Sequence, residues 1–280
     1  FRALLSVLGR RRLLKMRGLA FTERRAADVP EGHLRRIDLC WSLAHGLSGV
    51  DLVRSADFQV RNLAFALDAG EPVRIAAALA LQGILSALEN QEGVARASAL
   101  AASATELAQR LQEPSAQAWS EAVAGVIAWS ESRFADTVQV LERSTTMFRE
   151  RCRDAVREIG SLETWFILHA YFLMGHLDTV SARAAASVAE ARARGDRYTE
   201  STARAYIMPL VWLAIDRPTE AREEARGAIA LWGHDGKTGW HHQHWAELRA
   251  QCCVDLYEGT AAQAVQRLDE TRRRMKESLV

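Results

Sequence analysis

Apolar residues recur at spacings of three and four along most of the chain, which is the pattern of amphipathic α-helices. Between Tyr198 and Gly233 this pattern predicts two helices joined at residues 216–218, where the sequence reads Asp-Arg-Pro. Pro218 suits the first turn of the second helix, because an amide proton is not needed there. Runs rich in Val, Ile and Thr, which favour strands, are almost absent. The pattern therefore predicts an all-α fold built from helical hairpins.

The hairpin pattern returns at a period of 42 residues. Pro30, Pro72 and Pro114 follow this spacing, and each precedes an apolar helical stretch. The turns inside the hairpins keep the same spacing, at Gly49, Gln91, Arg133, Gly175, Arg217 and Gly259. We therefore expect a basic capping helix and linker over residues 1–29 and a repeat array over residues 30–280, with units starting near residues 30, 72, 114, 156, 198 and 240.

One hairpin leaves an apolar face that it cannot bury alone, so we expect the units to stack into a right-handed α-solenoid of about six hairpins with a concave surface. Residues at one early position of the second helices are mostly small, as close helix packing requires: Ala95, Thr137, Thr179, Ala221 and Gln263. This is similar to the tetratricopeptide pattern, whose period is about 34 residues. HEAT-type repeats share the longer period, so the subtype stays open. Pro209 lies inside a predicted helix and is expected to bend it.

The composition changes this picture little. With 49% hydrophobic and 25% charged residues the chain suits a protein folded in water, and no apolar run approaches the about 20 residues that a membrane span needs. The four cysteines have no CxxC spacing, which favours thiols in a reducing compartment: Cys40, Cys152, Cys252 and Cys253. A cytoplasmic location is therefore expected.

The charge is concentrated near the start of the chain. Residues 1–36 contain ten Lys or Arg and three acidic residues, and residues 1–18 read FRALLSVLGRRRLLKMRG. This stretch has the composition of a basic targeting or membrane-surface helix, but a solvated helix that caps the array is the simpler interpretation. Nucleic acid is not an expected partner, because no aromatic residues interleave with the basic run. The first residue is Phe, so we expect a piece of a longer polypeptide.

Two short motifs imitate chemical sites. Gly236-Lys237-Thr238 would end a phosphate-binding loop, but position 231, which should be Gly, is Leu. His241 and His244 lie one helical turn apart, as zinc ligands do, yet the only further ligands nearby are His242, Glu247 and Cys252. The HExxH motif and a Ser, His and acid grouping are both absent. We therefore expect no metal, no cofactor and no catalytic residue in this chain.

Seven of the eight tryptophans fall on the predicted first helices of the hairpins, the helices that line the concave face in tetratricopeptide-like arrays. Their positions within the units differ, so most are expected to be core residues. Trp119 and Trp245, however, share one position, five residues after a unit start, and Arg35 does too. The candidate residues of a concave binding face are Arg35, Trp119, Trp212, His241, His244 and Trp245.

Several phrases resemble the C-terminal repeat region of large bacterial serine/threonine protein kinases that carry a STAND-type ATPase module. They are RGLAF at 17–21, RIDLCWS at 36–42, ADFQVRNLAFALDAGEP at 56–72, ERC at 150–152, ARGDRY at 193–198, QHW at 243–245 and LYEG at 256–259. The resemblance implies that a kinase domain and an ATPase module precede this region, which itself lacks the GxGxxG, HRD and DFG motifs of a kinase.

The resemblance also implies a role. Such a region would be a non-catalytic module for protein–protein interaction or sensing in signal transduction. Its partner would be a protein or peptide, or another domain of the same polypeptide. The alternative is a small-ligand-sensing helical domain that controls the attached ATPase or kinase. A single pocket lined by aromatic and polar side chains near Trp212, His244 and Trp245 would favour this alternative.

Overall fold

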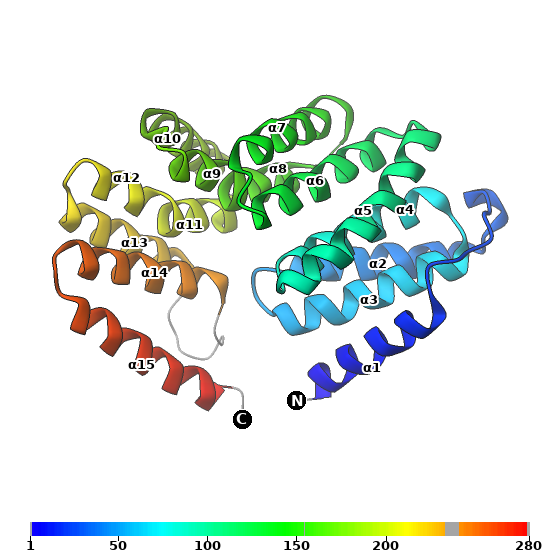
Figure 1. Ribbon diagram of the computed structural model, residues 1–280, viewed down its shortest axis with the longest axis horizontal. Helices are drawn as coiled ribbons and strands as arrows, with labels where there is room; N and C mark the ends of the chain where they lie inside the picture. Colours follow the sequence, from blue (N-terminus) through cyan, green and yellow to red (C-terminus); the bar gives the residue numbers. More distant parts are fainter. Residues whose placement is uncertain (1, 154, 233–240, 279–280) are drawn as a thin grey trace. The chain divides into compact units, whose positions relative to one another are not determined.

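The computed structural model describes residues 2–153, 155–232 and 241–278. All regular structure in these residues is helical, and none of it is a strand (Figure 1). The predicted all-α fold class is therefore confirmed for the described part of the chain. None of its helices is both long enough and apolar enough to cross a membrane. The chain divides into two compact units, Phe1–Ile159 and Gly160–Val280, each described by itself below.

Unit 1 consists of helices joined by short turns, with a 3₁₀ turn at Ala26–Asp28 in the one longer connection. The helices are α1 (Arg2–Arg17), α2 (Glu31–Leu47), α3 (Leu52–Ala69), α4 (Pro72–Ala87), α5 (Gln91–Leu111), α6 (Pro114–Ser130), α7 (Phe134–Arg151) and the start of α8 (Val156–Leu162). Helices α2 and α3 pack against each other, as do α4 with α5 and α6 with α7. Helices α3 and α5 then pack on the first helix of the following pair.

Local sequence explains where these helices begin. Pro72 and Pro114 occupy the first turns of α4 and α6, where their fixed φ suits a helix and no amide proton is needed. The side chain of Asn90 accepts a hydrogen bond from the Gly93 amide at 2.8 Å and caps α5. Gly70 ends α3 at φ 76°, and a Cβ there would collide with the Thr22 carbonyl. Capping and apolar periodicity therefore agree on the same boundaries.

The core of unit 1 lies between the paired helices and is aliphatic, with Ile37, Leu63, Ile75, Leu79 and Leu141 all at most 2% exposed. Close helix approaches occur at glycines. A Cβ on Gly83 would lie 2.7 Å from Val123 Cγ2, and one on Gly125 would collide with the Leu141 side chain. Ala95 and Gln263, which the sequence assigns to close packing, are instead exposed, because that position of α5 and α15 faces away from the paired helix.

Unit 2 is also made of antiparallel helices, but two of them are irregular. Its elements after α8 are the π-helical segment η2 (Glu163–Ile167), α9 (Leu168–Leu173), α10 (Leu177–Arg194), α11 (Arg197–Tyr206), α12 (Met208–Ala214), α13 (Pro218–Trp232), α14 (His242–Tyr257) and α15 (Ala261–Ser278). Its core cluster includes Leu168, Val180, Ala205, Ile207 and Ala228, all at most 1% exposed. The Gly-Lys-Thr motif at residues 236–238 and Trp240, at the start of the sixth predicted unit, lie outside the described residues.

Candidate functional site

The richest group of functional side chains in unit 2 surrounds Tyr206. We call it the Tyr206 cluster, and its members are Trp165, His169, Tyr206, His242, Trp245 and Arg249. The Trp165 ring lies 4.6 Å from the Tyr206 ring, 5.4 Å from that of His242 and 6.3 Å from that of Trp245, measured between centroids. Tyr206 and Trp245 are 5.9 Å apart. These separations are those of interacting aromatic pairs.

Two backbone irregularities bring these rings together. Trp165 lies in η2, a π-helical segment, which inserts about one extra residue into a helical turn and so rotates the side chains that follow. Tyr206 is the last residue of α11, and Ile207 separates it from α12. Such π segments occur frequently at functional sites, because they re-aim side chains that a regular helix would bury. The cluster therefore depends on two breaks in otherwise regular helices.

Pro209 explains the second break. It has no amide proton to donate to the carbonyl of residue 205, and its ring disfavours a continuous helix. The Leu210 amide then donates to the Ile207 carbonyl at 3.0 Å, instead of the Tyr206 carbonyl that a regular helix would use. Tyr206 consequently presents its carbonyl to α14. The irregularity thus lies where Pro209 in the sequence predicts it.

Arg249 uses this carbonyl. Its Nη1 donates a hydrogen bond to the Tyr206 carbonyl oxygen at 3.0 Å, and its guanidinium carbon lies 4.4 Å from the centre of the Tyr206 ring. The guanidinium therefore stabilises the end of α11 in two ways, by satisfying a carbonyl and by a cation–π interaction with the same residue. Arg249 projects from α14, so it also ties that helix to α11.

The interior of the cluster is held in neutral protonation states. Burial lowers the pKa of His169 to about 4, and the charge of Arg249 acts in the same direction. Burial raises the pKa of Tyr206, partly offset by Arg249, and burial lowers the pKa of His242. The Tyr206 hydroxyl and His169 Nδ1 are 3.0 Å apart and share a hydrogen bond. Arg249 is thus the charged member of a group of neutral rings.

The cluster is closed on one side and open on the other. Tyr206 is 4% exposed and rests on the aliphatic core of unit 2, whereas Trp245 is 44% exposed. Trp165, His242 and Arg249 are intermediate. A large aromatic ring that is fixed on a rigid base and half open to solvent has the features of a binding hot spot.

His241 and His244 take structural roles at the start of α14. His241 Nδ1 accepts a hydrogen bond from the Trp232 indole at 2.6 Å, and His244 Nδ1 accepts one from the His241 amide at 3.0 Å. His241 is buried, and the two rings are 5.4 Å apart. The Nδ1 atom of each histidine is therefore engaged, that of His241 in holding α13 and that of His244 in capping the helix. Within the described residues no group of three or more His, Cys, Asp or Glu side chains is placed to hold a metal ion.

Trp119 lies in unit 1 and has a different environment from Trp245. Its ring is 5.1 Å from Trp41, 5.3 Å from His45 and 5.4 Å from Phe148, and we call these four residues the Trp119 cluster. Trp119 is only 7% exposed. This burial argues against a binding role for Trp119, because α2 and α7 already cover its ring.

The other two predicted residues do not join either cluster. Arg35 is exposed on α2 and pairs with Glu31 at 2.6 Å. Trp212 lies on α12, where the guanidinium of Arg217 sits 5.7 Å from its ring. Of the six residues that the sequence indicates, only Trp245 is a member of the Tyr206 cluster. Sequence reasoning missed Trp165, Tyr206 and Arg249, although Tyr206 precedes Pro209 by three residues and Arg249 follows Trp245 by four.

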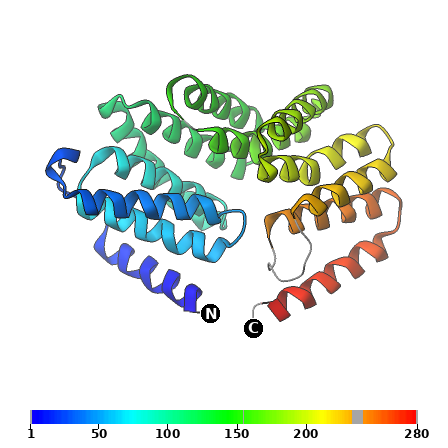
Figure 2. The same cartoon turned by 180° about the vertical axis from the view of Figure 1, so that it is seen from behind.

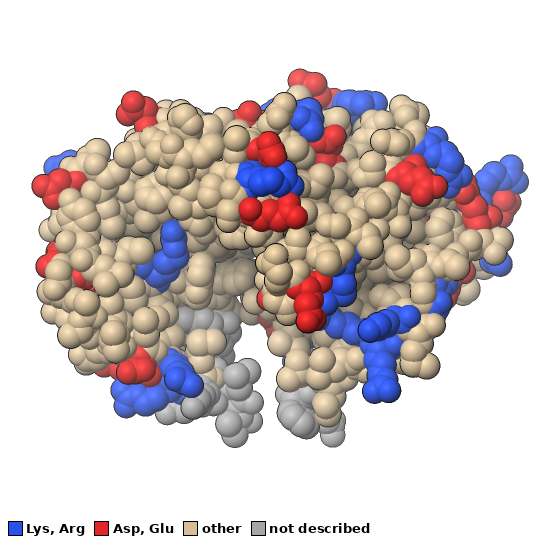
Figure 3. All heavy atoms as spheres, in the orientation of Figure 1, with Lys and Arg blue, Asp and Glu red and all other residues tan. Residues whose placement is uncertain are grey.

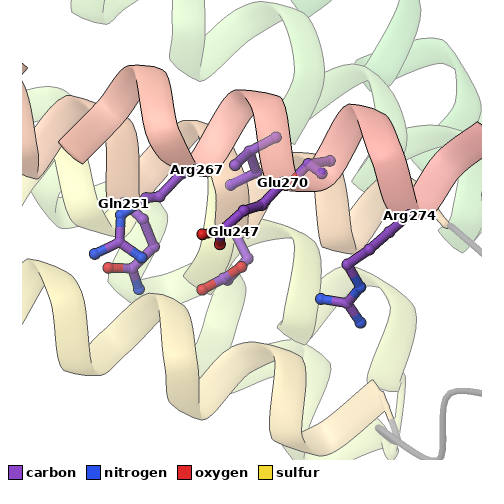
Figure 4. A pocket seen from close by; sticks show the side chains of 7 residues that line it. Glu247, Gln251, Arg267, Glu270 and Arg274 are labelled. Atoms are coloured by element: carbon purple, nitrogen blue, oxygen red, sulfur yellow. The ribbon is translucent and has the colours of Figure 1, made fainter. Parts of the chain in front are cut away.

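A shallow cleft of about 140 Å³ lies between α14 and α15. Figure 4 shows Arg267, Glu270 and Arg274 projecting from α15 on the side where Glu247 and Gln251 of α14 lie. The two acidic and two basic side chains leave the cleft without a dominant charge. Arg267 is also engaged, because it pairs with the buried Asp255 at 2.6 Å.

The chain matches no protein-family model, and no curated protein matches it significantly.

Proposed function

We propose that this chain is a non-catalytic interaction module of a larger bacterial signalling protein, and that the Tyr206 cluster is its docking site. The observation that carries the proposal is Trp245, a 44% exposed ring that is fixed against Trp165 and Tyr206. Such a ring loses little side-chain entropy on binding, because its neighbours already hold it in place. The partner is a protein or peptide, or another domain of the same polypeptide.

The helix boundaries support a repeat architecture for this module. The first helices of successive hairpins begin at Glu31, Pro72, Pro114, Val156, Arg197 and His242, at intervals of 41 or 42 residues except for the last, which is 45. We propose that these hairpins are units of one tetratricopeptide-like α-solenoid. Arrays of this kind commonly bind partners along an extended face, since stacked repeats create more continuous surface than a globular domain of the same size.

The parent protein is proposed from the phrases that resemble kinase-associated repeats. RIDLCWS lies in α2, ADFQVRNLAFALDAGEP covers α3 and the start of α4, and QHW in α14 contains Trp245 itself. We therefore propose that the parent is a cytoplasmic serine/threonine kinase with a STAND-type ATPase module. In it, this helical region restrains the kinase and ATPase domains or recruits a partner protein. The resemblance supports the choice of parent, and Trp245 supports the choice of surface.

The chemistry of the cluster indicates what the partner presents. The neutral rings of the cluster favour an apolar or aromatic side chain rather than a charged one, because the Arg249 guanidinium is already engaged with the Tyr206 carbonyl and ring. A small ligand is the alternative, and the cleft beside α15 is the nearest described candidate for it. Its volume of about 140 Å³ is below the roughly 300 Å³ at which ligand pockets usually begin, so the protein partner is favoured.

A matched pair of variants on α14 tests the proposal. Trp245→Ala removes the exposed ring of the cluster, whereas Tyr257→Ala removes an equally exposed ring, 50% against 44%, at the other end of the same helix. Partners captured by the wild-type chain from bacterial lysate are identified and titrated against both variants by calorimetry. We expect Trp245→Ala to weaken the identified partner about thirtyfold, as an aromatic hot spot does, and Tyr257→Ala to leave it within about twofold.

Equal affinities of the two variants would contradict the docking site. Circular dichroism of each variant checks that a loss of affinity does not come from unfolding, because unfolding would reduce the helical signal. In the full-length parent the same pair of variants tests regulation: kinase output should change with Trp245→Ala and stay constant with Tyr257→Ala.

A further inference from the structure

Helix α1 carries an unusual surface. Most of its large apolar side chains are exposed, by 47% to 76%: Leu4, Leu5, Leu8, Leu13 and Met16. Among the described side chains of the helix, Val7 is the single buried apolar one. Both views of the ribbon show α1 beside α3 at an edge of unit 1, and α3 is its main packing partner (Figures 1 and 2). Clustered exposed leucines of this kind normally mark a surface that something covers.

The basic residues of α1 divide into two sets. Arg10 pairs with Asp57 at 3.3 Å, Arg11 with Glu89 at 2.6 Å and Arg17 with Asp68 at 2.9 Å, so these three fasten the helix to α3 and to the turn after α4. Arg12 and Lys15 are exposed and form no ion pair within the described part of the chain. The sequence of α1 contains no acidic residue. Its solvent face is therefore both apolar and positively charged.

Helical spacing places these two properties on one face. Leu5, Leu8, Arg12 and Lys15 follow one another at intervals of three and four residues, and Met16 lies four residues after Arg12. Such spacing aligns side chains along one side of an α-helix. Figure 3 shows basic side chains and uncharged surface over the position of α1, with acidic side chains beside the basic ones at one edge of this region. The face thus joins large apolar side chains to two cations, Arg12 and Lys15, that form no ion pair in the described part of the chain.

Charge and shape together restrict what covers this face. A symmetric contact through this face would gather two copies of Arg12 and Lys15 in one interface, and α1 supplies no acidic residue to offset them, so the like charges would repel. A partner peptide is usually held in a groove, whereas α1 offers the convex side of a single helix. An anionic lipid surface suits both properties, because leucines enter the interface while Arg and Lys contact the headgroups.

We propose that α1 is an interfacial helix that binds the surface of an anionic phospholipid bilayer through Leu5, Leu8 and Met16 with Arg12 and Lys15. The helix lies in the plane of the interface and does not span the membrane. Arg10, Arg11 and Arg17 stay paired with unit 1 and hold the helix in the orientation that exposes this face. The inference is independent of the Tyr206 cluster, which belongs to unit 2.

Vesicle co-sedimentation tests the proposal on the full chain. Vesicles of phosphatidylserine and phosphatidylcholine in equal parts should bind the protein, and vesicles of phosphatidylcholine alone should bind it far less. The double variant R12Q/K15Q should lower the partition coefficient about thirtyfold, since each cation near an anionic surface contributes about fivefold. The matched control is Arg149→Gln, which removes an exposed charge from α7 of the same unit.

The apolar part of the face is tested separately. Leu8→Ser with Met16→Ser should reduce binding by roughly tenfold or more, whereas Leu39→Ser, at a 63% exposed position of α2, should not. All of these side chains are exposed, so a thermal melt should show each variant as stable as the wild type.

Three outcomes would overturn the proposal. The first is that the protein fails to sediment with anionic vesicles, which would also leave an acidic protein as the better occupant. The second is binding that R12Q/K15Q and Arg149→Gln reduce equally, which would mean non-specific charge attraction. The third is a lipid-free dimer in analytical ultracentrifugation that Leu8→Ser with Met16→Ser dissolves, which would assign the face to a second copy.

Discussion

The Trp119 cluster of unit 1 and the Tyr206 cluster of unit 2 contain similar rings in different settings. Both combine tryptophan, another aromatic ring and a histidine whose pKa burial lowers to about 4. In unit 1 the tryptophan is 7% exposed and is covered by Trp41 and Phe148. In unit 2 the corresponding ring, Trp245, is 44% exposed. The same chemistry therefore serves packing in one unit and offers a surface in the other.

The difference lies in the backbone rather than in the choice of side chains. Helices α6 and α7, which supply Trp119 and Phe148, are uninterrupted, so their rings interlock with that of Trp41 on α2. In unit 2, η2 and the break at Ile207 turn Trp165 and the end of α11 toward α14. Irregular helices thus expose a ring cluster that regular helices would have buried.

The largest expected effect comes from truncating the two tryptophans. Trp119→Ala should lower the free energy of unfolding by about 3–5 kcal/mol, because it leaves a cavity in a closed cluster. Trp245→Ala should cost only about 1 kcal/mol, because nearly half of its surface is already in contact with water. Urea unfolding followed by far-UV circular dichroism measures both.

The difference between the losses of unfolding free energy in these two variants decides whether the two rings have different roles. Costs that agree within about 1 kcal/mol, which is close to the usual effect of one substitution, would mean that the two rings contribute alike and that Trp245 is a core residue. A Trp245 cost larger than the Trp119 cost would reverse the comparison altogether.

Acidification should act on both clusters through their histidines. Burial, reinforced by the charge of Arg157, lowers the pKa of His45 to about 4, against about 6.5 in the unfolded chain. The unfolded state therefore takes up the proton first, so the stability contribution is complete above pH 6.5 and is lost as the pH falls toward 4. The loss for His45 should reach about 3 kcal/mol.

The variants His45→Leu and His169→Leu separate the two contributions. Each should flatten the fall of unfolding free energy between pH 6.5 and 4 to a similar extent, because burial lowers the pKa of both histidines to about 4. Urea titrations at several pH values measure the slope. If the wild-type slope persists in both variants, neither histidine is the source of the acid sensitivity.

Much of the fold is predictable because its determinants are local. The apolar spacing predicts helices, and Pro72 and Pro114 begin two of them as their positions suggest. The break beside Ile207 follows from Pro209, since a residue without an amide proton cannot continue the hydrogen-bond ladder. The π-helical segment at Glu163–Ile167 has no such marker. It depends on packing between helices distant in sequence, which a single chain pattern does not contain.

The candidate site is less predictable for the same reason. Trp119 and Trp245 share one position in their predicted units, yet one is covered and the other is not. Position within a repeat indicates the face of a helix but not whether a neighbouring ring, such as Trp41, fills the space above it. Arg249 is harder still to predict, because its role exists only after the Tyr206 carbonyl has been released from the helix.

A smaller effect is expected at Arg249, the cation that contacts both the ring and the carbonyl oxygen of Tyr206. Arg249→Met keeps the apolar stem but removes the hydrogen bond to the Tyr206 carbonyl and the cation–π contact, so we expect a loss of about 1–2 kcal/mol in unfolding free energy. Arg226→Met, at an exposed position of α13, is the matched control and should cost less than about 0.5 kcal/mol. Near-UV circular dichroism should also change for Arg249→Met alone, because Trp165 and Trp245 would lose the fixed orientation of the ring between them. If both variants behave alike, Arg249 does not organise the cluster, and the exposed ring of Trp245 rests on packing in unit 2 just as Trp119 does in unit 1.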